Sequence, residues 1–152
     1  MNHNRVFDND FGIQTDTQAD LEISHNDVVK HRGDGIVVCG DPLFFCGQAT
    51  ALTIRQNEIT DNAGSGIALF DADSNLFKSN HIERNGVPAG DTTDGFRVDT
   101  KSNGNRILEN RLNTNEAHDC HDESAGDGTA GTANSWINNR GETQNRPGLC
   151  RP

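Results

Sequence analysis

The sequence of 152 residues has no tyrosine, one tryptophan and few large apolar side chains. Hydrophobic residues make up 32% of it, and they occur singly rather than in runs. A broad apolar core is therefore excluded, and each element can bury only a narrow stripe. No window is long or apolar enough to cross a bilayer. Because apolar residues do not recur at i, i+3, i+4 and i+7, almost no α-helix is expected.

Basic residues are also scarce: 13 Lys and Arg stand against 23 Asp and Glu, which gives a net charge of -10. No cluster of basic residues offsets this charge locally. Such a chain repels nucleic-acid phosphates and anionic lipids, so neither nucleic acid nor membrane insertion is expected. Sugars and Ca²⁺ remain as partners, and no cofactor is required.

The four cysteines match no zinc-binding spacing. Their even number favours two disulfides and an oxidising compartment. We expect Cys39 to pair with Cys46 and Cys120 with Cys150, because each pair brackets one irregular segment. Loop-closure entropy predicts about 2.5 kcal/mol for the short loop and about 3.5 kcal/mol for the long one. Free buried thiols are the alternative.

Asparagine and glycine are abundant, and asparagine follows a pattern. A phrase of Asn-x-aliphatic-x-x-Asn returns five times, with His31 once in the final place. The copies are NRVFDN from Asn4, NDVVKH from Asn26, NEITDN from Asn57, NHIERN from Asn80 and NRLNTN from Asn110. The leading asparagines are 22, 31, 23 and 30 residues apart. These intervals predict a coil of about 22 or 23 residues with insertions.

Each repeat contains two further short apolar segments. A glycine and an apolar residue follow the phrase at Gly12-Ile13, Gly35-Ile36, Gly66-Ile67 and Gly95-Phe96. A strand before the phrase carries Ile23, Ile54, Phe77 and Ile107. Three strands per coil, stacked at about 4.8 Å, would align these apolar residues in internal columns. Glycine and asparagine suit the corners, and stacked asparagines would satisfy one another's buried amides.

These residues resemble the right-handed parallel β-helix repeat of the pectate-lyase-like superfamily, in its extracellular bacterial type. The resemblance covers residues 4 to about 122 and implies an all-β solenoid of about five coils. The remaining residues abandon the phrase and include Trp136, so we expect a disulfide-tied C-terminal cap. The predicted division is coils over 1–122 and a cap over 123–152. A sugar-stacking role for Trp136 is the alternative.

The N-terminal end has no equivalent cap, because the chain enters the first phrase at Asn4 without a preceding strand. We therefore expect the chain to be the C-terminal part of a longer solenoid, or to associate end to end through its first coil. Residues 1–20 also lack the pattern of a signal peptide. We expect an extracellular or cell-surface protein whose signal has been removed or lies upstream.

Two insertions interrupt the coils. One spans 39–50 and bears Phe44 and Phe45, and the other spans 86–94. Loops that project from a regular scaffold commonly form binding walls. We therefore predict that Phe44 and Phe45 contact substrate. Tolerated surface insertions are the alternative.

Alignment of the strands that follow the glycine corners places Phe96 and Val98 inward. The outward positions then form three columns. They are Gln14, Val37, Ala68, Arg97 and His121; Asp16, Cys39, Phe70, Asp99 and Glu123; and, at the corner, Asp34, Ser65, Asp94 and His118. The last two coils would present one patch of Asp94, Arg97, Asp99, His118, His121 and Glu123.

This patch suits acid–base chemistry on a uronic acid polymer. Arg97 would neutralise a substrate carboxylate, and His118 and His121 would transfer protons. The carboxylates of Asp94, Asp99 and Glu123 would bind substrate, orient a histidine or hold Ca²⁺. The lyases and epimerases that the chain resembles use outward residues on such strands for catalysis. This chain departs from them, because it has no tyrosine to donate a proton and matches none of their catalytic sets.

Two interpretations of the patch without acid–base catalysis remain. Its groups could be solvated charge pairs beside the cap, with Asp122 capping a turn or bonding buried amides. Metal binding by His118 and His121 is a further hypothesis, although two histidines on a corner and a strand need not converge.

A separate turn, Asp71-x-Asp73-x-Asn75, has oxygen ligands at alternate positions, as at the start of a calcium loop. It lacks the remaining positions of that loop, and a corner stabilised by Asx turns is the alternative.

The sequence favours an extracellular module that binds, or is displayed on, polysaccharide or a cell-surface glycan. A polysaccharide lyase or C5-epimerase acting through Arg97, His118 and His121 is the second hypothesis, and a structural rod is the third.

Overall fold

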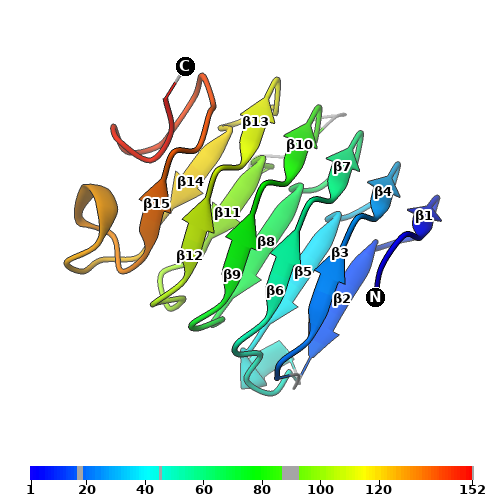
Figure 1. The fold of residues 1–152 in the computed structure, drawn as a ribbon, viewed down its shortest axis with the longest axis horizontal. Coiled ribbons are helices and arrows are strands. Elements are labelled where there is room, and N and C mark those ends of the chain that lie inside the picture. Colours follow the sequence, from blue (N-terminus) through cyan, green and yellow to red (C-terminus); the bar gives the residue numbers. More distant parts are fainter. Residues whose placement is uncertain (17–18, 45, 87–92, 152) are drawn as a thin grey trace.

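The computed structural model describes residues 1–16, 19–44, 46–86 and 93–151, without the side chain of Phe44. Short parallel strands form three sheets that turn around one core (Figure 1). The first sheet contains β1 (Arg5–Phe7), β4 (Asp27–Val29), β7 (Glu58–Thr60), β10 (His81–Glu83) and β13 (Arg111–Asn113). The second contains β2 (Ile13–Asp16), β5 (Ile36–Cys39), β8 (Ile67–Phe70), β11 (Phe96–Val98) and β14 (Cys120–Asp122). The third contains β3 (Glu22–Ser24), β6 (Thr53–Arg55), β9 (Leu76–Lys78), β12 (Arg106–Leu108) and β15 (Ser135–Ile137).

Each coil contributes one strand to each sheet, so the chain is an all-β, right-handed parallel β-helix, as predicted. The described residues contain two 3-10 turns, η1 (Pro42–Phe44) and η2 (Thr129–Gly131), and no α-helix. Within the described ranges, no helix is long and apolar enough to cross a membrane. In Figure 1 successive coils run from the N-terminal to the C-terminal end of the rod.

Apolar side chains fill the core as columns that run through the coils. In the third sheet the register aligns Ile23, Ile54, Phe77, Ile107 and Trp136. All five are buried, and Phe96 packs edge-on against both Phe77 and Trp136. Trp136 therefore extends a core column and is not a surface platform for sugar.

Buried asparagine ladders hold the corners together, as the repeated phrase predicts. In the first ladder each side-chain Nδ2 donates to the Oδ1 of the asparagine one coil further on. Its members are Asn4, Asn26, Asn57, Asn80, Asn110 and Asn139. A second ladder contains His31, Asn62, Asn85 and Asn115. His31 substitutes for asparagine there because its Nδ1 accepts the backbone N–H of Asn9.

Removing one amide from the first ladder should be costly. Asn80 accepts both the backbone N–H and the side-chain amide of Asn57. Asn80→Ala leaves these two buried donors without an acceptor, so we expect the free energy of unfolding to fall by roughly 2–3 kcal/mol in urea denaturation. Asn113→Ala, at a partly exposed position of β13, is the control and should change it by less than about 0.5 kcal/mol. Equal effects would show that the ladder adds nothing.

The C-terminal segment closes the last coil. Cys120 is bonded to Cys150, and Cys39 to Cys46, so both predicted disulfides are present. β15 lies within the predicted cap but pairs with β12, so the coil path continues past residue 122. The division at that residue stays a prediction.

Asp122 points inward and supports the start of this segment. It is fully buried, and it accepts hydrogen bonds from the Nδ2 of Asn134 and the Nε1 of Trp136. Its other oxygen accepts the backbone N–H and hydroxyl of Ser124. The interpretation that Asp122 bonds buried amides is confirmed.

The two insertions are only partly described. The side chains of Phe44 and Phe45, and residues 87–92, lie outside the described part of the chain. The substrate contacts predicted for these two phenylalanines stay predictions.

At the N-terminal end of the rod, β1, β2 and β3 are the first strands of their sheets. Association through this end also stays a prediction.

Candidate functional site

The outer face of the second sheet carries the columns expected from the sequence. Arg97 pairs with Ala68 on one side and with His121 on the other. Phe96 and Val98, which flank Arg97, are buried in the core. The side chains between the inward positions therefore form a continuous outward row across the five strands.

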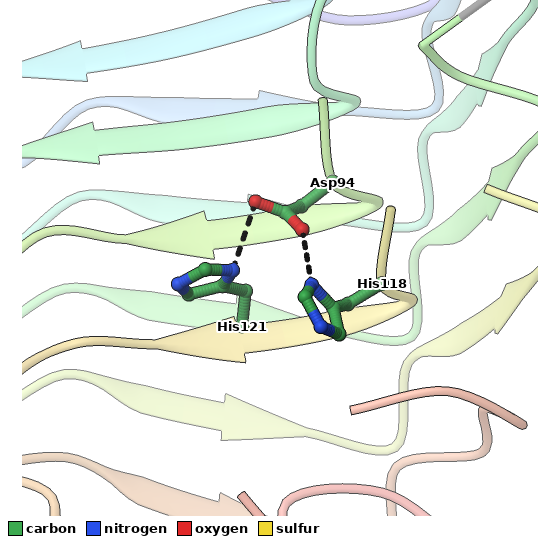
Figure 2. Close-up of side chains that lie close together, drawn as sticks. All are labelled: Asp94, His118 and His121. Carbon is green, nitrogen blue, oxygen red and sulfur yellow. Dashed lines mark hydrogen bonds and ion pairs between the residues drawn. The ribbon is translucent and has the colours of Figure 1, made fainter. Parts of the chain in front are cut away.

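Three side chains converge where this row meets the corner before β11 and β14. Asp94 and His118 occupy the same corner of successive coils, and His121 lies within β14 (Figure 2). Nδ1 of His118 lies 3.0 Å from Oδ1 of Asp94 and forms a hydrogen bond with it. Nδ1 of His121 lies 3.1 Å from Oδ2 of Asp94, an ion-pair distance without the alignment of a hydrogen bond. Asp94 is 1% exposed, so both imidazoles cover a buried carboxylate.

Backbone hydrogen bonds between coils fix this corner. Gly95 donates its N–H to the carbonyl of His118, and the N–H of Asp94 donates to Oγ of Ser65. A Cβ atom at Gly95 would lie 2.7 Å from the carbonyl oxygen of Asp119. Only glycine lets successive coils approach this closely, and that approach brings Asp94 beside the two histidines.

Two charged residues extend the cluster outward. Nε2 of His121 lies 3.1 Å from Oε1 of Glu123. The same carboxylate oxygen is 3.7 Å from the guanidinium of Arg97. His121 therefore lies between two carboxylates, and the second of these also pairs with an arginine.

The electrostatics of the cluster favour a charged pair. Burial acts to raise the pKa of Asp94, but His121 and, to a smaller extent, His118 hold that pKa below its usual value. The Asp94 carboxylate raises the pKa of His121 against the opposing effect of burial, and Glu123 adds to this rise. Arg97 acts in the opposite direction on His121. Asp94 and Glu123 thus both favour the protonated form of His121.

His118 has a different environment. Its Nδ1 donates to Asp94 when the imidazole is neutral, which leaves Nε2 as an acceptor. The side chain is 36% exposed, whereas that of His121 is 15% exposed. The cluster thus contains one solvent-facing imidazole oriented by a buried carboxylate, and this arrangement could transfer protons or hold a metal ion.

Asp99 does not join the cluster. Its Oδ1 accepts the backbone N–H groups of Lys101 and Ser102 and the hydroxyl of Ser102, and its Oδ2 accepts the N–H of Asp71. The carboxylate therefore stabilises its own turn. The substrate contact expected of Asp99 stays a prediction.

The residues of the candidate calcium turn are engaged in structural hydrogen bonds. Asn75 is buried in a third asparagine ladder, where its oxygen accepts the N–H of Leu52. Asp73 accepts hydrogen bonds from Asn103 and Gln48. These contacts join the turn to neighbouring coils, so the alternative of Asx turns and Ca²⁺ binding at Asp71, Asp73 and Asn75 both stay predictions.

An apolar pocket lies further along the same outer face and was not expected from the sequence. It has a volume of about 230 Å³. Its lining consists of Phe11, Gln14, Asp34, Val37, Cys39, Cys46 and Phe70. Burial raises the pKa of Asp34, although the backbone of Ser65 and the charge of Arg97 oppose this. The apolar outward residues Val37 and Phe70 were the available sequence signal, since outward positions of a solenoid are usually polar.

The comparisons with known proteins agree with this architecture. The family described as "Right handed beta helix region" matches residues 39–146, and the chain belongs to that family of right-handed β-helix proteins. A mutant of the periplasmic alginate epimerase AlgG has a similar structure, with a TM-score of 0.59 and 18% sequence identity. The match covers 80% of this chain and 26% of the epimerase, so this chain spans about a quarter of that protein's length. At this identity the likeness concerns the fold. Comparison with curated proteins finds no match.

Proposed function

We propose that this β-helix binds a uronic acid polysaccharide along the outer face of the second sheet, in the periplasm or outside the cell. The observation that carries the proposal is the composition of that face, where an apolar pocket and the cluster around Arg97 lie on the same row of strands. Two disulfides favour an oxidising compartment. The fold shared with a periplasmic alginate epimerase supports a polysaccharide ligand.

The two parts of the face suit the two parts of an acidic sugar. Phe11 and Phe70 in the pocket offer apolar surface for the C–H faces of sugar rings. The guanidinium of Arg97 and the ring N–H beside Glu123 in His121 offer donors for a carboxylate. Both donors already lie beside the carboxylate of Glu123, so their spacing is compatible with a carboxylate between them.

Loss of Arg97 should weaken binding of an acidic polymer. With alginate or polygalacturonate oligosaccharides, we expect Arg97→Ala to reduce affinity roughly tenfold in calorimetry, because one charge-assisted contact is lost. Arg111→Ala removes an exposed arginine from β13 on another sheet and should leave affinity unchanged. Binding of neutral dextran, which has no carboxylate, tests whether the carboxylate of the ligand is required. Equal binding of both variants, or no binding of wild type, would contradict the proposal, and the latter result would favour a structural rod.

A second candidate function is lyase or C5-epimerase chemistry, and the Asp94–His118 pair favours it. Nε2 of His118 would accept the C5 proton of a uronate, while Arg97 and His121 stabilise the negative charge that develops on its carboxylate. Loss of the 4-O leaving group, which takes a proton from water, would give a C4–C5 double bond. Return of a proton from water to the opposite face of C5 would give the epimer.

Two readouts separate these outcomes. Elimination produces the absorbance of an unsaturated uronate, whereas epimerisation in deuterated water places deuterium at C5. Either signal should be present in wild type and in His81→Gln, whose histidine lies beside Glu83 in the first sheet, and absent from His118→Gln. Activity that persists in His118→Gln would exclude His118 as the proton acceptor.

A further inference from the structure

We propose that Asp94, His118 and His121 form a binding site for a divalent transition-metal ion such as Zn²⁺. One carboxylate oxygen and one ring nitrogen from each histidine all lie within 4.8 Å of one another. Figure 2 shows both imidazoles beside the carboxylate, each joined to one of its oxygens by a dashed line. This site goes beyond polysaccharide binding and does not depend on it.

The separations between the candidate ligand atoms are within reach of a small cation. The Nδ1 atoms of His118 and His121 lie 3.0 and 3.1 Å from different oxygens of Asp94. Ligands at about 2.0–2.1 Å from a tetrahedral zinc ion stand about 3.3 Å apart. Because one atom from each residue already lies within 4.8 Å of the others, a metal ion would need to draw the side chains together by rotamer adjustment.

Two atoms of the cluster lack the hydrogen bonds that their burial demands. Among the described residues, Oδ2 of Asp94 and Nδ1 of His121 are buried without a hydrogen-bond partner, although they face each other. Buried polar atoms without partners are rare and costly. One cation bound to both atoms would satisfy them together.

The surroundings of His121 resemble the outer ligand shell of a metal site. Metal-bound histidines usually donate their second ring N–H to a carboxylate, which fixes the ring and increases its basicity. Nε2 of His121 lies 3.1 Å from Glu123 in this way. The positive charge of Arg97, which would oppose a cation, is paired with the same Glu123 carboxylate.

The ligand set selects the class of ion. Imidazole nitrogens favour zinc and the late first-row metals, whereas Ca²⁺ and Mg²⁺ prefer sites built from oxygen alone. Three protein ligands leave at least one coordination position open, as in catalytic zinc sites. The partly exposed side of His118 places that position toward solvent. A metal bound at Nδ1 of His118 would replace the proton shared with Asp94, so the bound and metal-free forms are alternative states of one cluster.

Calorimetric titration of the EDTA-treated chain of 152 residues with ZnCl₂ tests the site. We expect one zinc ion per chain, with Ca²⁺ and Mg²⁺ bound at least about tenfold more weakly. His118→Gln and His121→Gln should each weaken zinc binding about tenfold or more, and Glu123→Gln about tenfold. All cysteines among the described residues are in disulfides, so no thiol competes for the ion.

His25→Gln is the matched control, because His25 and His3 form a second, stacked pair of imidazoles on the exposed N-terminal coil. It should leave zinc affinity unchanged. Substitution of wild type with Co²⁺ provides a measurement that requires no variant to fold, and X-ray absorption should then show nitrogen and oxygen ligands. The site is rejected if wild type binds no zinc, if the His118 and His121 variants bind like wild type, or if only His25→Gln loses affinity. Failure of zinc binding leaves the Arg97-dependent binding of polysaccharide, measured in EDTA, unaffected.

Discussion

Replacing Asp119 by asparagine is expected to lower the free energy of unfolding by roughly 2–4 kcal/mol. Asp119 is buried, and its Oδ1 accepts the backbone N–H and the Nδ2 of Asn115. Its Oδ2 accepts the backbone N–H groups of Glu142 and Thr143. Turned one way, the NH₂ group of an asparagine faces the two buried N–H donors of Asn115; turned the other way, it faces the partly buried N–H groups of Glu142 and Thr143. Urea denaturation followed by circular dichroism measures the loss.

Asp127→Asn is the control for this substitution, because Asp127 is exposed and also lies in the C-terminal segment. It should change the free energy of unfolding by less than about 0.5 kcal/mol. If Asp119→Asn were equally harmless, the carboxylate would not be needed as an acceptor, and the end of the second ladder would have to be held by other contacts.

The position of Asp119 explains a departure from the repeat. In earlier coils this position of the corner is glycine, because the next coil passes within 2.7 Å of where a Cβ would lie, as at Gly95. At the last coil the backbone of Asp119 instead bonds Thr143 of the C-terminal segment. A side chain therefore fits at position 119. The carboxylate of Asp119 takes the place of the asparagine that a further coil would supply to Asn115.

The repeated phrase predicts the fold because each of its positions has a separate physical task. The aliphatic residue, such as Ile82, enters the core, and the asparagines at its two ends, such as Asn80 and Asn85, join two ladders. A register error of one residue would expose Ile82 and bury charged neighbours. The same constraint fixed the outward columns, so the proximity of Arg97 and His121 followed from the alignment alone.

The details of the site depend on geometry that the phrase does not encode. The sequence placed Asp94, His118 and His121 in one patch, but it could not indicate that both imidazoles turn their Nδ1 atoms to the same carboxylate. Nor could it indicate that Asp99 folds back onto Ser102. The apolar pocket was missed for a related reason: residues from separate coils and the Cys46 disulfide loop form it together, and no local pattern joins them.

Removal of the Cys120–Cys150 disulfide is expected to lower the free energy of unfolding by about 3.5 kcal/mol. The bond joins β14 to the end of the chain across a separation of 30 residues, and both cysteines are buried. Without it the unfolded chain gains loop-opening entropy. The double variant Cys120→Ala/Cys150→Ala isolates this bond, and urea denaturation under non-reducing conditions measures its contribution.

The Cys39–Cys46 bond offers a matched comparison, because it closes a separation of only 7 residues. The corresponding double alanine variant should lose about 2.5 kcal/mol, less than the C-terminal pair. An equal or reversed order would show that strain or native-state contacts, not loop entropy, dominate.

The position of the Cys120–Cys150 bond has a further consequence for the site. Cys120 precedes His121 in β14, which is the last strand of the second sheet, so its outer edge is held only by the C-terminal segment among the described residues. Loss of the bond should therefore weaken zinc binding as well, whereas loss of the Cys39–Cys46 bond, which lies beside the apolar pocket, should not.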